Sequence, residues 1–211
     1  MQTARIYIFG DSLVYGAWDS QGGWCDRLKQ RLHHHKLNST TKQKFQVYNL
    51  GIGGDTSTAL LKRFPAEMAA RHRPDWPAVI VIAVGANDTR KKHIDGPSLT
   101  DLTTYQANLE QLITLSQTYT NQIVLVGIAP IKPGIQELKG SFFSNETFAD
   151  YDAVITKIAD KYQLPKVEVM SILGQNTSTL HSEDGVHLND LGHQQLAELV
   201  WPTLAQILQV S

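Results

Sequence analysis

The sequence is poor in cysteine and has no excess of charge of either sign. Cys25 is its single cysteine, so no intramolecular disulfide can form. Its 211 residues include 19 Lys and Arg against 20 Asp and Glu, a formal charge of −1 at pH 7. Proteins that bind nucleic acid or anionic membranes through overall charge need a basic surplus. We therefore expect neither kind of partner.

Long hydrophobic runs are also missing. The longest, at residues 79–84, is far shorter than the ~18 residues that suggest a membrane span. The first ten residues hold one Arg and a short apolar stretch, which is too little for a signal peptide. Cleavage after the usual ~15–30 residues would also remove a polar motif at residues 10–12. We expect a cytoplasmic protein without stable membrane insertion.

The chain does have a globular balance of residues. Hydrophobic residues make up 42% and charged residues 18% of the sequence, a composition that argues against disorder. No internal repeat, low-complexity tract or linker divides it. We therefore predict a single domain over residues 1–211 with one functional site.

Short β-favouring apolar runs alternate with segments of helical period. The strongest runs lack apolar-polar alternation, which is typical of strands buried on both faces of a parallel sheet. We predict strands at residues 6–9, 79–84 and 123–128, and weaker ones at 45–50 and 167–172. We predict helices at about 24–37, 58–71, 102–119, 148–162 and 191–208. Pro65 and Pro202 are expected to kink or restart theirs.

Five strands alternating with five helices predict the α/β class, as a three-layer αβα sandwich around a five-stranded parallel sheet. The chain order favours the flavodoxin-like strand order 2-1-3-4-5. In such folds the ligand site lies beyond the carboxyl ends of the strands. Functional residues are therefore expected in the turns that follow the strands.

Each of the first three strands ends in a polar turn that contains glycine. These turns are residues 10–13 (GDSL), 51–56 (GIGGDT) and 85–88 (GAND). A parallel sheet brings such turns to one edge although they lie tens of residues apart in sequence. In the order 2-1-3, Ser12 would lie between Gly54 and Asn87.

A fourth polar segment follows the last predicted strand. Asp184 and His187 flank an Asp-Gly turn there, which would bring the carboxylate close to one imidazole nitrogen. The connection 173–186 is long enough to cross the ~14 Å to the first strand, so His187 can reach Ser12. These three residues have the types of a Ser-His-Asp triad.

Acyl transfer would give each of these residues a task. Ser12 becomes a nucleophile once a base removes its proton, and histidine suits that task near neutral pH. Asp184 would hold the tautomer of His187 and stabilise its imidazolium form. The backbone amides of Ser12 and Gly54 and the side-chain amide of Asn87 would stabilise the oxyanion.

Other residues near these motifs have structural interpretations. Asp11, Asp55 and Asp88 are expected to hydrogen-bond backbone amides in their turns. His193 is expected to be a packing or surface residue of the last helix. Residues 130–145 form a long connection, either a lid, a substrate wall or a disordered insertion. Some aromatic residues could line an acyl pocket, although isolated aromatics more often belong to the core: Tyr15, Trp18, Trp24, Phe142 and Phe143.

Two other functions could use the same segments. His181, Asp184 and His187 have the residue types of a metal-ligand cluster and suggest a metal-dependent hydrolase, although Gly185 disfavours a helix that would align them. The second alternative is a flavodoxin-like module that binds a phosphorylated ligand after the first strand. That turn lacks the composition of a phosphate cradle. The G-x-S-x-G motif of the α/β-hydrolases is absent around Ser12.

Four segments resemble, in order, the sequence blocks of the GDSL-type esterases and lipases of the SGNH hydrolase superfamily. They are residues 10–13 (GDSL), 53–56 (GGDT), 85–88 (GAND) and 184–189 (DGVHLN). The resemblance implies the sandwich predicted above. It assigns the nucleophile to Ser12, the oxyanion donors to Gly54 and Asn87, and the base to His187, with Asp184 completing the triad. Leu188 departs from the pattern, because members often carry proline there.

The resemblance implies a serine esterase that forms an acyl-enzyme and uses no metal or cofactor. Its substrates would be carboxylic esters, with thioesters as a further class. The run 54–57 (GDTS) is most similar to the small bacterial arylesterase, thioesterase and lysophospholipase branch. The expected partner is a small-molecule ester. The acyl chain, the leaving group and the oligomeric state stay open.

Overall fold

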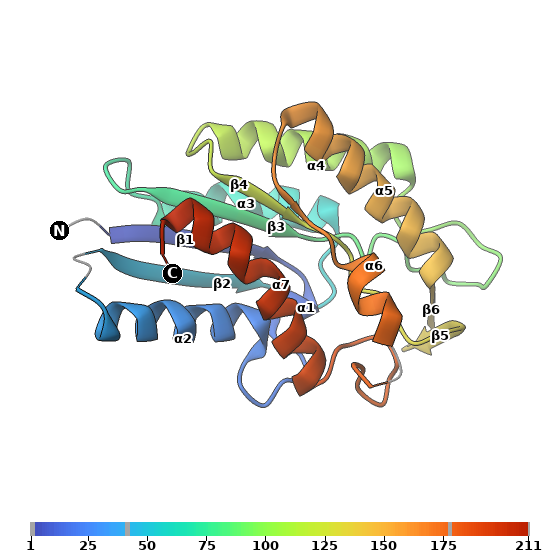
Figure 1. The fold of residues 1–211 in the computed structure, drawn as a ribbon. Coiled ribbons are helices and arrows are strands. Elements are labelled where there is room, and N and C mark those ends of the chain that lie inside the picture. Colours follow the sequence, from blue (N-terminus) through green and yellow to red (C-terminus); the bar gives the residue numbers. More distant parts are fainter. Residues whose placement is uncertain (1–2, 41–42, 177–178, 211) are drawn as a thin grey trace.

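The computed structural model describes residues 3–40, 43–176 and 179–210 and shows an α/β fold (Figure 1). Five parallel strands form the main sheet in the order β2-β1-β3-β4-β7. Counted along the chain, these strands have the predicted order 2-1-3-4-5, which is confirmed. Their bounds are β1 Thr3–Gly10, β2 Lys44–Gly51, β3 Ala78–Ala83, β4 Ile123–Val126 and β7 Lys166–Val167.

Helices cover both faces of this sheet and confirm the three layers (Figure 1). On one face lie α2 Gly23–Asn38 and α7 Asp190–Leu208; on the other lie α3 Ser57–Arg71, α4 Leu102–Gln117 and α5 Asn145–Tyr162. Shorter elements are α1 Ser12–Tyr15, α6 Met170–Leu173 and the 3-10 turn η1 Gly174–Asn176. Within the described residues, no helix combines the length and apolar character needed to cross a membrane.

The interior strand β1 is covered on both of its faces. All of its residues are buried. Ile6 and Ile8 belong to the core under α2 and α7, whereas Tyr7 and Phe9 belong to the core under α3, α4 and α5. Successive side chains of a strand point to opposite faces. A strand covered on both sides therefore favours consecutive apolar residues, which β1 has from Ile6 to Phe9.

The carboxyl ends of three neighbouring strands lie level with one another. Gly10 of β1 pairs with Gly51 of β2 on one side and with Ala83 of β3 on the other. The three polar turns that follow these strands therefore begin at the same edge of the sheet, which the fold class predicts.

The fifth strand is shorter than predicted. β7 ends at Val167, and the predicted strand residues 170–172 lie in the helix α6. Val169 and Leu173 are both buried, and the Leu173 amide donates to the Val169 carbonyl. Residues four apart share one side of a helical turn. This part of the apolar run is therefore helical, and the prediction of strand there is wrong.

The two prolines do not restart their helices. α3 continues through Pro65 and α7 continues through Pro202. Both prolines are exposed, so the carbonyl four residues earlier, which loses its N–H partner, lies on the side that water can reach. Buried residues beside each proline, such as Phe64 and Met68, hold the helix against the sheet.

The connection 130–145 contains a hairpin rather than a disordered insertion. β5 Ile135–Leu138 and β6 Ser141–Ser144 pair antiparallel. The two residues between them, Lys139 and Gly140, both have positive φ, at 50° and 71°. This is the requirement of a type I′ hairpin turn. The hairpin lies at the carboxyl end of the sheet (Figure 1).

We predict that Phe64→Ala lowers the free energy of unfolding by about 3–5 kcal/mol, because it leaves a cavity in the core. Phe64 is fully buried, and its ring centre lies 4.8 Å from that of Phe9 on β1. Urea denaturation measures the change. Leu37→Ala is the control, since Leu37 is 82% exposed. Equal effects of the two substitutions would contradict this packing.

Candidate active site

Ser12 is the first residue of α1 and follows β1 after one residue, Asp11. The Asp11 carboxylate accepts a hydrogen bond from the Leu13 amide at 3.1 Å and begins the helix at Ser12. Such a side chain at the N-cap satisfies one of the amides that have no partner within the helix. Asp11 thus contacts a backbone amide, as predicted, and its bond holds Ser12 directly beyond the end of the strand.

The turn after α6 forms around the carboxylate of Asp184. Its Oδ1 accepts hydrogen bonds from the Val186 amide at 2.9 Å, the His187 amide at 2.9 Å and the Ser182 hydroxyl at 2.8 Å. Its Oδ2 lies 2.7 Å from Nδ1 of His187. The Asp-Gly turn therefore places the carboxylate against the imidazole, as the spacing of the two residues predicts.

A chain of hydrogen bonds links this turn to Ser12. His187 Nε2 lies 2.9 Å from Ser12 Oγ, although the two residues are 175 positions apart in sequence. An ionised carboxylate can only accept hydrogen bonds, so Nδ1 of His187 donates to Asp184. Nε2 is then the acceptor for the hydroxyl hydrogen of Ser12. The structure thus brings the three residues together in the predicted order.

The environment of Asp184 favours its ionised form. Partial burial acts to raise the pKa of this carboxyl group, but hydrogen bonds from His187, Val186 and Ser182 hold the pKa well below its usual range. Donors to a carboxylate stabilise the charged form. Asp184 therefore remains a negatively charged acceptor beside the imidazole.

Gly54 lies on the wall of the cleft into which Ser12 opens. Its φ is 85°, in the left-handed region that favours glycine. A Cβ there would meet no protein atom within 4 Å, so the backbone conformation is the reason for glycine. Among the described residues, the amides of Ser12 and Gly54 donate to no protein acceptor. Both can therefore bind an acceptor on a ligand.

Asn87 lines the same cleft and is held by Asp11. Its Nδ2 donates to Asp11 Oδ2 at 3.3 Å, and an amide nitrogen has a second hydrogen available for a ligand. Burial raises the pKa of Asp11 from 3.8 to about 6, against the lowering effects of the Leu13 amide and of nearby His187. One buried carboxylate therefore holds both the turn of Ser12 and the amide of Asn87.

Asp88 ties the turn after β3 to the start of α3. Its carboxylate accepts the amide of Ser57 at 2.9 Å and the hydroxyl of the same residue at 2.6 Å. Burial raises the pKa of Asp88, and the two bonds from Ser57 oppose that effect. Asp88 thus accepts a backbone amide as predicted, and it fixes Asn87 relative to the segment that carries Gly54.

Arg63 joins the ends of β1 and β2. Its guanidinium donates to the Leu50 carbonyl at 2.7 Å, to the Gly10 carbonyl at 3.1 Å and to Asp55 at 2.6 Å. Asp55 therefore pairs with a side chain, and the predicted hydrogen bond to a backbone amide is wrong. The guanidinium can make several bonds at once because it is a planar group with five N–H donors.

The site opens into a cleft of about 1010 Å³. Of the aromatic residues proposed for a pocket, Tyr15, Trp18 and Phe143 line it, whereas Trp24 is buried in the core. Phe142 is not among the lining residues. The hairpin supplies part of one wall of the cleft. Further lining side chains include Arg90, Leu138, Lys139, Ser141, Phe148 and Val186.

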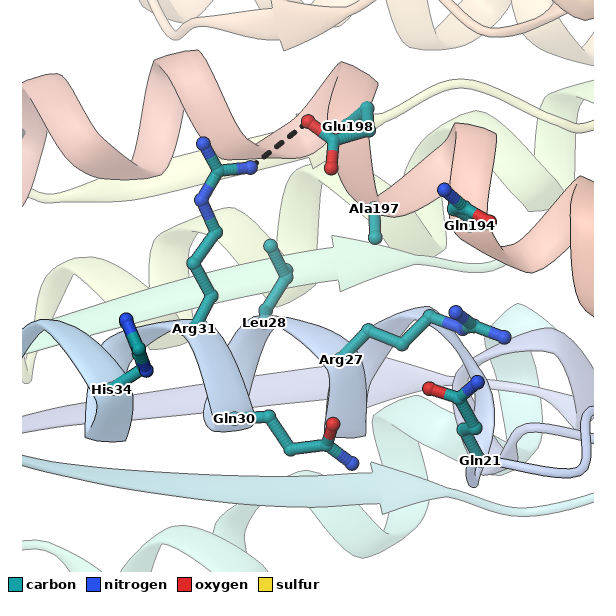
Figure 2. A pocket seen from close by; sticks show the side chains of 9 residues that line it. All are labelled: Gln21, Arg27, Leu28, Gln30, Arg31, His34, Gln194, Ala197 and Glu198. Carbon is teal, nitrogen blue, oxygen red and sulfur yellow. Dashed lines mark hydrogen bonds and ion pairs between the residues drawn. The ribbon is translucent and has the colours of Figure 1, made fainter.

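A second hollow, of about 640 Å³, lies between α2 and α7 (Figure 2). Figure 2 shows Arg31 of α2 extending toward Glu198 of α7, and the two pair at 2.9 Å. Arg27 pairs with Asp19. No residue that lines this hollow is Ser or Cys. We therefore place the candidate active site in the cleft beside Ser12.

The residues of the alternative metal cluster do not form a ligand set. His181 Nε2 donates to the Pro130 carbonyl at 2.7 Å, while Asp184 and His187 bond to each other. No three His, Cys, Asp or Glu side chains in the described part of the chain are grouped so that they could hold a metal ion.

Leu188, where the family often has proline, is fully buried and pairs with His181.

The model of the GDSL-like lipase/acylhydrolase family matches residues 8–195. The chain belongs to this family. The match runs from β1 into α7 and includes all five residues that the resemblance singles out. Membership makes this protein a carboxylic ester hydrolase of the GDSL type.

Characterised relatives match the chain over most of its length. Esterase TesA of Pseudomonas aeruginosa is 28% identical over 204 residues, which covers 96% of this chain and 89% of that protein. The isoamyl acetate-hydrolyzing esterase of Saccharomyces cerevisiae is 24% identical over 204 residues, covering 92% and 83%.

Solved structures share the fold. A lipase/acylhydrolase from Enterococcus faecalis superposes with a TM-score of 0.73 at 19% identity, covering 97% of this chain and 95% of that one. Axe2, an acetylxylan esterase from Geobacillus stearothermophilus, has a TM-score of 0.74 at 20% identity, covering 95% and 93%. These neighbours confirm the SGNH hydrolase fold.

Some residues of the site are not predicted from the sequence. Arg63 lies inside α3 with no motif around it, and its three acceptors come from other segments. The hairpin has a weak signal, because Lys139-Gly140 separates two short stretches that contain apolar residues. That signal could have placed β5 and β6 but not their position beside the cleft.

We predict that the stability of the Asp11→Asn variant relative to wild type increases as the pH rises from about 4 to about 7. The pKa of Asp11 is raised from 3.8 to about 6 in the folded protein. The folded state therefore binds this proton more tightly than the unfolded state. The contribution of Asp11 to stability is fully present below pH ~4 and falls by about 3 kcal/mol as the pH passes ~6.

Urea denaturation of both proteins between pH 4 and pH 8 measures this difference. Asn at position 11 does not titrate, so the variant lacks the fall in stability that wild type shows. Asp75→Asn, which changes an exposed carboxylate, is the control. A difference between Asp11→Asn and wild type that does not depend on pH would contradict the buried, protonatable state of Asp11.

Proposed function

We propose that this protein hydrolyses small carboxylic esters through an acyl-enzyme on Ser12, with thioesters as a further substrate class. The observation that carries the proposal is the unbroken chain from Ser12 Oγ to His187 Nε2, and from His187 Nδ1 to Asp184 Oδ2, at 2.9 and 2.7 Å. Nucleophile, base and orienting carboxylate within hydrogen-bond reach are the geometry of a Ser-His-Asp hydrolase.

In the first half of the reaction, Ser12 Oγ attacks the ester carbonyl while Nε2 of His187 takes the hydroxyl proton. The tetrahedral intermediate collapses, and His187 returns the proton to the leaving alkoxide or thiolate. Water then attacks the acyl-enzyme while His187 takes its proton, and the second tetrahedral intermediate collapses with release of the carboxylic acid and return of the proton to Ser12 Oγ. The carboxylate of Asp184 stabilises the imidazolium that forms in both halves.

The negative charge on the former carbonyl oxygen needs donors that are already in place. The amides of Ser12 and Gly54 and the side-chain amide of Asn87 supply them in this proposal. Asp11 holds Asn87 by the bond at 3.3 Å, so the amide does not have to reorient during the reaction. Preorganised donors of this kind are a large source of rate acceleration.

The wall of the cleft and the relatives support a small ester as substrate. Leu138 and Phe143 give the cleft an apolar part suited to an acyl or alkyl group. The yeast and Pseudomonas relatives are named as esterases, and Axe2 as an acetylxylan esterase. We also propose that residues 1–211 act as a single domain without a cofactor, in the cytoplasm.

The alternative of a phosphate-binding module has less support. The turn after β1 holds the buried carboxylate of Asp11, which opposes a phosphate at pH values where it is ionised. The module would also give Asp184 and His187 no task. The metal-dependent alternative is tested below by a chelator.

We predict that a fluorophosphonate probe labels Ser12, and that Ser12→Ala and His187→Ala each lower kcat for p-nitrophenyl acetate by ~10⁴-fold or more. The double variant should be little worse than either single one, because the residues act as one unit. Peptide mapping of the adduct and steady-state kinetics measure these effects.

Controls separate this proposal from its alternatives. Ser141→Ala changes another hydroxyl that lines the cleft and should leave labelling of Ser12 intact. Loss of activity with a chelator would favour the metal-dependent reaction. Labelling that does not occur at Ser12, or losses that multiply in the double variant, would overturn the acyl-enzyme mechanism.

We predict that Asn87→Ala lowers kcat about 10²–10³-fold with a smaller change in KM, because an oxyanion donor acts mainly in the transition state. Steady-state kinetics on p-nitrophenyl acetate measure both constants. Asn121→Ala is the control, since Asn121 is exposed in the turn before β4. A rise in KM with unchanged kcat would show that Asn87 binds substrate rather than stabilising the oxyanion.

A further inference from the structure

The geometry points to Trp18 as a positioning residue of the catalytic site. Its indole N–H donates to the carboxylate of Asp184, and its ring packs edge-on against His187. This inference rests on the proposed function, because it concerns the residues that act in that mechanism. Trp18 precedes α2, in the loop that joins α1 to it. It comes from a different part of the chain than the Asp184 turn, 166 positions away in sequence.

The contacts of Trp18 reach both partners of the Asp-His pair. Its Nε1 donates to Asp184 Oδ2 at 3.1 Å. Its ring stands edge-on to the imidazole of His187, with ring centres 6.2 Å apart and planes at 88°. This edge-to-face arrangement is one that aromatic rings favour. A single side chain thus contacts both the carboxylate and the imidazole.

The two oxygens of Asp184 have different tasks. Oδ1 takes three donors from its own turn and holds the carboxylate in place. Within the described residues, the donors to Oδ2 are His187 Nδ1 and Trp18 Nε1. The indole N–H draws negative charge from the oxygen that faces the imidazole. It therefore limits how strongly Asp184 stabilises the imidazolium, which favours return of the proton to the leaving group.

The backbone of Trp18 supports a role in the site. Its φ is 68°, in the left-handed region, which is an outlier for a bulky residue. The side chain is also 67% exposed, so burial in the core does not account for it. Strained residues of this kind persist where the surrounding structure holds them, and they concentrate at functional sites.

The loop that carries Trp18 is fastened to α7 and to the start of α2. His193 on α7 is buried, accepts the Trp24 amide through Nδ1 and donates from Nε2 to the Ala17 carbonyl. His193 is therefore the packing residue that is predicted. Asp190 at the start of α7 accepts the Ser20 amide at 2.9 Å. These bonds hold the residues on both sides of Trp18.

The test is Trp18→Phe, which keeps an aromatic ring and removes the N–H. Active sites are counted with the fluorophosphonate probe, and kcat and KM for p-nitrophenyl acetate are measured against pH. Per active site, kcat should fall about tenfold with KM within about twofold, the effect of one lost hydrogen bond to a charged group. The acid limb of the kcat/KM profile should move to higher pH.

The direction of that movement follows from the groups around the imidazole. Asp184, Asp11 and His193 are the titratable groups that act on His187. Only Asp184 loses a donor in Trp18→Phe. Its carboxylate then carries more charge toward the imidazole, the imidazolium becomes more stable, and the base remains protonated to higher pH.

A matched control is Trp76→Phe, because Trp76 lies at the opposite end of the sheet, just before β3, and stacks with Arg5. Its kinetics and pH profile should equal those of wild type. Trp18→Gly is a second variant that removes the ring as well and suits the positive φ. It should lose more kcat than Trp18→Phe.

Three results would overturn the inference. In the first, Trp18→Phe has the kcat and the acid limb of wild type. In the second, Trp18→Phe lowers only the number of active sites or the melting temperature, which is the result of a purely structural role. In the third, wild type is not labelled at Ser12, which removes the proposed function and this inference with it. Normal labelling of wild type with an unaltered Trp18→Phe removes the inference alone.

Discussion

The candidate site depends on the register of three parallel strands. Gly10 pairs with both Gly51 and Ala83, so β1, β2 and β3 end at one level. A slip of one residue would exchange the side chains that pack under the two layers of helices, Ile6 and Ile8 for Tyr7 and Phe9, because side chains alternate along a strand. The packing on both faces of β1 therefore fixes its register, and with it the level at which the three strands end and their turns begin. Ser12 and Asn87 line the same cleft as a consequence.

The base reaches this edge in a different way. His187 belongs to no strand, and its position comes from the turn around Asp184, whose carboxylate accepts bonds from three groups of that turn on one oxygen. A hydrogen bond to a charged group contributes ~1.5–3 kcal/mol to stability, so three such bonds hold the turn in place. Trp18 donates to the Asp184 carboxylate of this turn, and residues of α7 hold the segment that carries Trp18. Rigid strand ends thus position the nucleophile, and a hydrogen-bonded turn positions the base.

Much of the fold could be predicted because its signals are local. The apolar run of β1 predicts a strand covered on both sides, and this is what the two cores on its faces require. The prediction failed at residues 170–172, where a short apolar run does not distinguish a strand from one helical turn. The restart expected at Pro65 also does not occur, because α3 continues through that residue. Propensity opposes proline inside a helix, but the packing of neighbouring Phe64 is the stronger effect.

The sequence by itself determined the fold class, the strand order and the family, and it singled out the residues that meet at the sheet edge. Turn composition and apolar periodicity carry that information within short windows. Only the tertiary structure decided that Arg63 holds Asp55 and that the Trp18 indole binds Asp184. The partner of a charged or polar side chain depends on which distant segments pack beside it. No local sequence pattern indicates which partner such a side chain will have.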